Sequence, residues 1–383
     1  MKHCFSKLTV LIVALTLLSS TAFAERELSS MASAGTPPTL QLDAGPLSVT
    51  FSGRAQLQLA ILTGEDALLS DGDAAEYAGF RLRRARLGMT ALYNKTITVG
   101  VEVDLLESEG SALHEAYLGW ENEMALVYGG LVKTPLSRSA LHSSRSLQLG
   151  ERPIGIKGIA PFHQLGVLVG ARMWGRKVRI LTGVFNGMQR DDTFAGGYTR
   201  IDPSIGNRFG GVAFASRIDI EPLGLLGSGA SDLTHSPKPL LGLGGGVMGN
   251  RGKTIHGLAF GGDLAFKWMG FSLMAEYLRD QSQPADEPTQ STTEQAETKR
   301  SVMSGQMGYA VIKNMLDVAA RVEMVDENED IEDEGDFLAI AGAVSLYLSR
   351  GHLKIQLFYQ HRQEQHGKQR RNNVLLIQTE GRF

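Results

Sequence analysis

The chain has 383 residues, 43% of them hydrophobic, and a formal net charge of −3. Its single cysteine, Cys4, excludes an internal disulfide and any site built from several thiolates. Its 38 basic and 41 acidic residues nearly balance, and we expect no nucleic-acid partner.

Residues 1–24 have the pattern of a cleaved secretory signal peptide. A head containing Lys2 and Lys7 precedes the apolar run 8–18, and 22–24 is a small-x-small cleavage site. Cleavage would remove Cys4 and both lysines, leaving a chain of net charge −5 without a thiol. No later segment is apolar for the roughly 18 residues of a transmembrane helix. An exported chain without disulfides needs another source of stability, and a closed barrel supplies one.

Residues 25–46 are rich in Ser, Ala and Pro, and we interpret them as a periplasmic tail. From residue 47 to residue 383 apolar and polar residues alternate, which predicts a transmembrane β-barrel with one face on lipid and one on water. The clearest segments are 48–61, 97–105, 258–268, 316–324, 353–362 and 375–383.

Connections alternate between tight and long along this region. Tight turns are predicted near 94–95, 121–123, 175–176, 269–270, 313–314 and 349–351, and the links between them are mostly longer and polar. Short periplasmic turns and long outer loops are typical of membrane barrels. The pattern predicts an all-β, closed antiparallel barrel of about 16 strands. The connection 222–239 is an exception, because it is too long for an ordinary periplasmic turn.

The carboxyl-terminal strand ends in an aromatic residue. Leu375, Ile377, Thr379, Gly381 and Phe383 share one face, and a terminal Phe on such a strand is what barrel-assembly machinery recognises. A soluble secreted protein could also end in Phe. Together with the signal peptide, the strand favours the outer membrane of a Gram-negative cell, with membrane lipid and lipopolysaccharide as surroundings.

Four stretches resemble the phosphate-selective porin O and P family. They are the arginine-rich 80–88, then 114–120 with 129–136, then 144–152 with 183–187, and the later strand segments 263–268, 275–277 and 317–322. The resemblance covers roughly 48–383. It implies a sixteen-stranded homotrimeric porin with inward-folded loops and with phosphate or polyphosphate as solute.

The third outer connection, 135–163, is the candidate constriction loop. Between residues 133 and 163 the chain has a net charge of +4, with Glu151 as the only acid. Fixed charges at the narrowest point set the ion selectivity of a porin, so we expect this loop to fold inward and favour anions. The basic residues are Lys133, Arg138, Arg145, Arg152 and Lys157. The alternative is that they pair with the wall carboxylates Glu102, Asp104 and Glu115 and only hold the loop.

A second group of basic residues lies on the polar faces of predicted strands. A positive charge facing lipid near the bilayer centre costs about 2–4 kcal/mol, so we expect these residues to line the lumen wall. They are Arg54, Arg84, Arg86, Arg172, Lys267, Arg321 and Lys354.

No enzyme, metal or cofactor site is predicted. His142, Ser143 and Ser144 are adjacent but lack a nucleophile-elbow motif. The acidic run 326–336 lacks the spacing of an EF-hand and fits a solvated outer loop.

Three functions remain open. The first is a porin that passes small solutes by diffusion and prefers anions. The second is a porin of weak or different selectivity, for example for an organic acid or a sugar. The third is a non-conducting surface barrel.

Overall fold

The computed structural model describes residues 40–62, 78–106, 112–191, 193–199, 203–227, 229–285, 296–369 and 372–383. All belong to one unit, Ala32–Phe383. The predicted signal peptide, the connection 107–111 and nearly all of 63–78 lie outside these residues. Among the described residues, no helix has the length and apolar character needed to cross a membrane.

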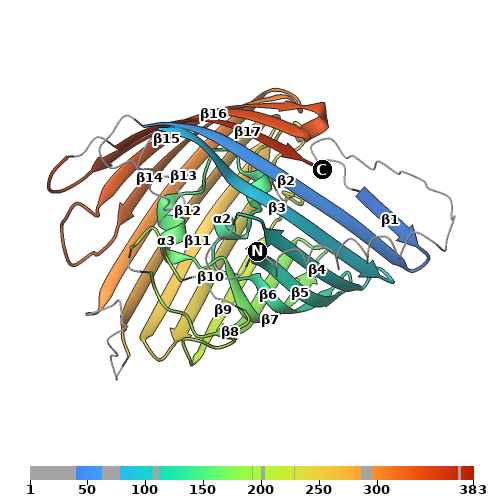
Figure 1. Cartoon of the computed structure of the whole chain (residues 1–383), viewed down its shortest axis with the longest axis horizontal. Coiled ribbons are helices and arrows are strands. Elements are labelled where there is room, and N and C mark those ends of the chain that lie inside the picture. Colours follow the sequence, from blue (N-terminus) through green and yellow to red (C-terminus); the bar gives the residue numbers. More distant parts are fainter. Residues whose placement is uncertain are drawn as a thin grey trace, which may run out of the picture. The chain divides into compact units, whose positions relative to one another are not determined.

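The predicted sixteen-stranded closed barrel is confirmed. Within the described residues, sixteen strands pair antiparallel with their neighbours in the chain, and the last bonds back to the first (Figure 1). Gln378 of the last strand is opposite Gln58 of the first. The strands are β2 (Leu47–Leu62), β3 (Gly79–Tyr93), β4 (Ile97–Asp104), β5 (Leu113–Glu121), β6 (Ala125–Lys133), β7 (His163–Met173), β8 (Val178–Asn186), β9 (Val212–Ile220), β10 (Leu240–Arg251), β11 (Ile255–Trp268), β12 (Phe271–Pro284), β13 (Thr298–Ile312), β14 (Leu316–Asp326), β15 (Phe337–Leu348), β16 (Leu353–Glu364) and β17 (Asn372–Arg382).

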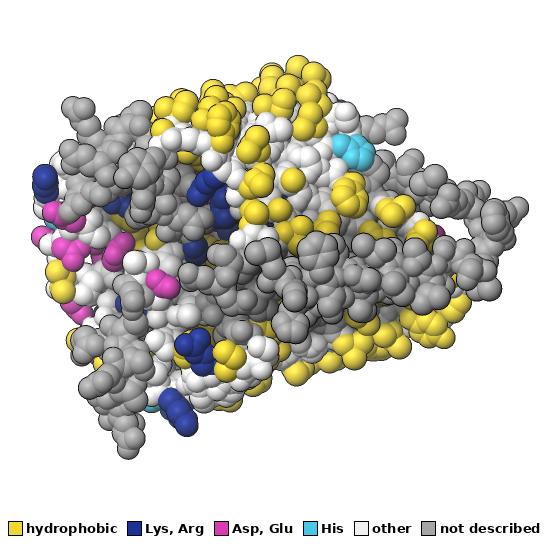
Figure 2. All heavy atoms as spheres, in the orientation of Figure 1, with side chains coloured by type: hydrophobic (Ala, Val, Ile, Leu, Met, Phe, Trp, Pro, Cys, Tyr) yellow, Lys and Arg dark blue, Asp and Glu magenta, His cyan; other side chains and the backbone are white. Residues whose placement is uncertain are grey.

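The side chains have the reverse of a soluble protein's distribution. In β16, Ile355, Leu357 and Tyr359 are 37–48% exposed. Their neighbours Lys354 and Gln356 are 4% and 1% exposed. Hydrophobic side chains gather over the outer face of the wall, and many charged ones lie toward one end (Figure 2). An apolar exterior and a polar interior are what a membrane barrel requires.

The predicted tight turns lie at one end of the barrel. Their backbones enter the left-handed region at Asn94, Lys95, Met269 and Asn314, with φ of 48–59°. Asn tolerates this region better than most residues because its short amide bonds locally. Since tight turns belong on the periplasmic side, the long connections mark the outer side.

One strand was not expected from the sequence. β1 (Leu40–Ala44) lies within the predicted tail and pairs with Leu47–Phe51 of β2. It continues the line of β17, and Phe383, the residue after β17, exchanges two backbone hydrogen bonds with Gly53 of β2. β1 therefore covers the part of the β2 edge that β17 is too short to reach (Figure 1).

The long connection after β6 folds into the barrel, as predicted. It carries the short helices α2 (Arg138–Leu141) and α3 (Ile154–Ile159) and the 3₁₀ turn η1 (Ser144–Ser146). Residues 134–162, called the inner loop below, are largely buried. The isoleucines of α3 are at most 1% exposed and belong to an apolar cluster with Val302 and Val325 of the wall.

Replacing Gly53 by Val should weaken the closure of the barrel. A Cβ at Gly53 would lie 2.4 Å from the Phe383 ring, so the ring must move off the seam between β17 and β2. We expect a loss of about 1–3 kcal/mol in the free energy of unfolding, measured by urea titration in detergent. Gly381→Val is the control, because a Cβ there meets nothing within 4 Å. Equal losses in the two variants would contradict this role for Phe383.

Candidate functional site: two cavities divided by the inner loop

The inner loop is fixed to the wall through its backbone. The carboxylate of Glu276 on β12 accepts hydrogen bonds from the N–H groups of Arg138 (2.9 Å) and Ser139 (3.2 Å). Glu323 on β14 accepts those of Ile154 (3.1 Å) and Gly155 (2.5 Å). Each carboxylate thus satisfies N–H groups at the start of a short helix, which have no partner within the helix itself.

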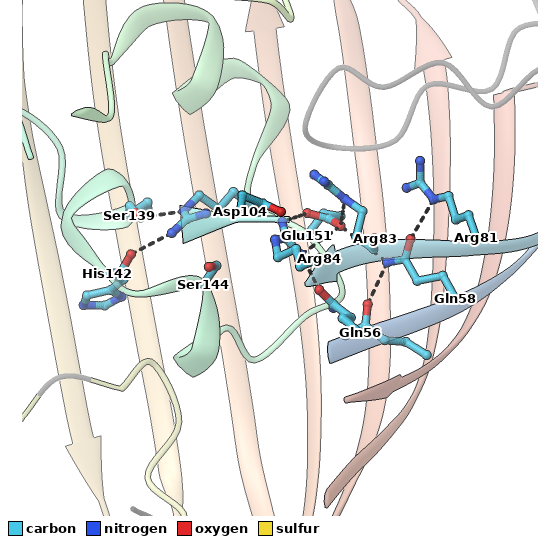
Figure 3. A network of polar contacts seen from close by, with 12 residues as sticks. Gln56, Gln58, Arg81, Arg83, Arg84, Asp104, Ser139, His142, Ser144 and Glu151 are labelled. Carbon is cyan, nitrogen blue, oxygen red and sulfur yellow. Dashed lines mark hydrogen bonds and ion pairs between the residues drawn. The ribbon is translucent and has the colours of Figure 1, made fainter. Parts of the chain in front are cut away.

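The only acid of the loop is its strongest side-chain anchor. Glu151 is 1% exposed and bonds Arg83 Nε (2.9 Å) and Arg84 Nη2 (2.8 Å) of β3 (Figure 3). Burial alone would favour protonation, but the two guanidinium groups hold the pKa of Glu151 well below its usual range. The loop is therefore pinned by a carboxylate that remains ionised at neutral pH.

A β-bulge makes this anchor possible. The register between β2 and β3 shifts between Gln56 and Leu57, which are opposite Arg84 and Leu82. Arg83 is the extra residue. Two consecutive arginines consequently reach the same loop carboxylate, although strict alternation would put them on opposite faces.

Two of the predicted loop cations pair with wall carboxylates. Arg138 binds Asp219 (3.3 Å) and Asp263. Arg145 binds Glu102 at 2.8 Å. Arg138 and Arg145 thus form ion pairs with the wall, as the alternative interpretation of the loop cations expected. Asp219 and Asp263, the partners of Arg138, were not among the expected carboxylates.

Lys133 and Arg152 have a different kind of partner. Lys133 Nζ donates to the carbonyls of Leu141 (2.7 Å) and His142 (3.1 Å). Arg152 donates to those of Ser139 (3.2 Å) and His142 (2.7 Å). Among the described residues neither cation has a carboxylate within 4 Å. Burial and the neighbouring Arg84 lower the pKa of Arg152 to about 9, so it remains charged at neutral pH.

The predicted lumen-wall residues lie on the inner face, but several are covered. Arg54 bonds Ser144 Oγ (2.6 Å), Arg321 the carbonyl of Glu151 (2.9 Å) and Lys354 that of Leu147 (2.8 Å), all in the inner loop. Their charges therefore hold the loop. Of the remaining four, Arg84 binds Glu151 of the inner loop, and Lys267 bonds the carbonyls of Leu226 and Gly229. Arg86 pairs with the wall acids Asp104 and Glu102. Arg172 pairs with Glu121.

The first cavity lies on the outer side of the inner loop and has a volume of about 1100 Å³. Residues of the outer connection 187–211 line its entrance, and Lys157 of α3 lines it as well. Its other basic residues are Arg83, Arg84, Arg86, Lys133, Arg145 and Arg152, and its acids are Glu102, Asp104, Glu115, Glu151 and Asp191. Cations are in excess, but only by two charges.

The second cavity lies on the periplasmic side and has a volume of about 500 Å³. Its wall includes the tight turn between β7 and β8. Its basic residues are Lys133, Arg138, Arg172, Arg176, Lys177, Arg179 and Arg217, against the acids Asp219 and Glu221. Lys133 and Ser143 line both cavities and therefore lie between the two.

Several residues of these cavities were missed in the sequence. A second bulge, opposite Glu102 and Val103, makes His114 the extra residue of β5. The His114 ring lies 4.6 Å from that of His163, and both line the first cavity. Arg217 sits on a strand whose alternation marks it as polar-faced, so that signal was present and not used. Arg179 shares its face of β8 with the buried Leu181 and Phe185, so alternation gave no signal there.

Metal ligands are scarce in the part of the chain that the structure describes. It contains no group of three or more His, Cys, Asp or Glu side chains arranged to hold an ion. In the acidic run 326–336, Glu329 instead pairs with Arg279 at 2.5 Å.

Removing the charge of Glu151 should release the inner loop. Glu151→Gln leaves two buried guanidinium groups without their carboxylate, which costs about 3–5 kcal/mol for a buried pair. We expect a lower free energy of unfolding in urea and protease cleavage within 134–162. Glu121→Gln, at the half-exposed pair with Arg172, is the control and should cost about 0–1 kcal/mol. An uncleaved loop in Glu151→Gln would show that Glu151 is not the main anchor.

Comparison with known proteins identifies the fold but no family. No protein-family model matches the chain. No curated protein matches it. The anion-selective porin from Comamonas acidovorans has 11% identity and a TM-score of 0.60, covering 88% of this chain and 100% of that one. The outer-membrane OmpT of Vibrio cholerae has 12% identity and a TM-score of 0.59, with 90% and 100% covered. Its in-vitro folded trimer form has 12% identity and a TM-score of 0.56, with 88% and 99% covered. At such identities the likeness concerns the fold alone: the chain has the fold of outer-membrane porin barrels.

Proposed function

We propose that this protein is an outer-membrane porin that passes small solutes by diffusion and prefers anions. The barrel is closed, its exterior is apolar, and two cavities lie in series along its interior. Basic residues exceed acidic ones in the lining of both cavities. Fixed charges along such a passage set its selectivity.

The main support for the proposal is that Lys133 and Arg152 bond backbone carbonyls instead of carboxylates. Both line the first cavity, and Lys133 lies where the two cavities meet. Neutral carbonyls orient them without cancelling their charge. Neither forms an ion pair within 4 Å among the described residues, so each leaves positive charge for a passing anion, whereas Arg138 and Arg145 are already paired.

A weakly selective porin is the second candidate, and one observation favours it. The first cavity contains Glu102, Asp104 and Glu115 on its wall, and these acids offset much of its positive charge. Phosphate as the solute rests on the sequence resemblance alone. Adding phosphate and measuring the chloride current distinguishes the two cases: block of the current is expected for a phosphate channel and no block for a general anion channel.

Neutralising Lys133 or Arg152 should shift the channel toward cations. A charge 4 Å from a passing ion contributes about 1 kcal/mol in water. Each Gln variant should therefore lower the chloride-to-potassium permeability ratio by about fivefold, measured as the reversal potential in a KCl gradient. Lys299→Gln, at an exposed pair with Asp330, is the control and should leave the ratio unchanged. A cation-preferring unaltered channel would refute the anion proposal.

We also propose that the protein assembles as a homotrimer in the outer membrane, in contact with lipid and lipopolysaccharide. The support is the sequence resemblance and the trimer form of the matched Vibrio cholerae protein. Light scattering of the detergent-solubilised protein should give a mass of three chains. A single-chain mass across several mild detergents would contradict the trimer.

A further inference from the structure

The connection 222–239, called the strap below, lies against the inner face of the barrel at its periplasmic end. Leu226 is 6% exposed and lies against Gly242 of β10, beside the Arg138 guanidinium. Lys267 Nζ of β11 bonds the carbonyls of Leu226 (2.9 Å) and Gly229 (2.5 Å). The first half of the strap is thus fixed below the inner loop.

The second half is fixed to the neighbouring turns. Asp232 accepts from the backbone N–H of Ser236 (3.0 Å) and of Gly270 (2.8 Å). His235 Nε2 bonds the carbonyl of Ala310 at 2.8 Å. The described residues of both halves are thus held at the periplasmic mouth.

The strap completes the wall of the second cavity, which is lined by apolar side chains from three elements and by basic side chains. The inner loop contributes Leu141, the β8 strand Leu181 and the strap Leu225. Basic side chains of the β7–β8 region face the same space. At about 500 Å³ the cavity falls within the range of small-molecule sites, about 300–1,000 Å³.

The positive charge of this cavity is incompletely neutralised. Two carboxylates serve three guanidinium groups here. Asp219 pairs with Arg138 (3.3 Å), Arg179 (2.8 Å) and Arg217 (2.7 Å), and Asp263 pairs with Arg138 and with Arg217 (2.6 Å). Lys177 Nζ bonds only the neutral carbonyl of Pro222 (3.2 Å) among the described residues. A bound anion would supply the missing negative charge.

We propose that the second cavity is a binding site for organic acids that carry one carboxylate and a small apolar body. The excess positive charge selects the carboxylate, and the three leucines favour a ligand with apolar surface over a fully hydrated ion. The site deepens the proposed anion preference, on which it rests. It would hold the solute between the inner loop and the periplasmic exit.

Benzoate and acetate are the probes, because they share the carboxylate and differ in the apolar body. In single-channel recordings, benzoate should block the chloride current at a concentration about tenfold lower than acetate, as expected for burial of additional apolar surface. Leu225→Ser should abolish most of that difference by raising the concentration at which benzoate blocks. Leu223→Ser is the matched control, since Leu223 is similarly exposed but does not line the cavity.

The outcomes separate this proposal from the one on which it rests. Equal block by benzoate and acetate in an anion-preferring channel would overturn the organic-acid site alone. A cation preference in the KCl gradient would overturn the anion proposal and the site with it. Retention of the benzoate advantage in Leu225→Ser, or its loss in Leu223→Ser, would also overturn the site as placed here.

Discussion

The structure depends on the pairing of every wall strand with two neighbours in a closed ring. Inside lipid no water can satisfy backbone N–H and C=O groups, so a sheet with a free edge is excluded. Closure forces side chains to alternate between lipid and lumen, and it brings polar residues from sixteen strands into one interior. β1 and Phe383 extend this pairing, because together they bond the part of the β2 edge that β17 does not reach.

The polar interior explains why a positively charged loop can fold inward. Wall carboxylates bind the loop at Glu276 and Glu323, and the loop's own Glu151 binds the wall in return. In addition, the loop cations Arg138 and Arg145 form ion pairs with wall carboxylates. Lys133 and Arg152 are instead held by carbonyls, so the contacts that fix the loop do not pair these two cations with a carboxylate.

The sequence predicted the wall well and the site only in part. Alternation and the spacing of tight turns follow directly from the two-residue period of a strand, so the strands, the turns and the inward loop were predictable. The two bulges were not, because one extra residue reverses the facing of its neighbours without a compositional signal. Arg83 and His114 were therefore missed or left unassigned. The pairing of Arg138 with Asp219 and Asp263 joins residues more than 80 positions apart, which a single sequence does not reveal.

The two cavities differ in the balance of basic and acidic residues in their linings. The outer cavity mixes cations and acids, so in the proposed channel its attraction for anions would be the weaker of the two. The inner cavity is smaller, more positive and partly lined by the strap, so in the proposed channel an anion beyond Lys133 would meet a stronger field in less space. Low-dielectric walls such as Leu181 intensify that field. In the proposed channel, binding must remain weak enough for release, and salt would screen exposed cations such as Arg179 at the periplasmic mouth.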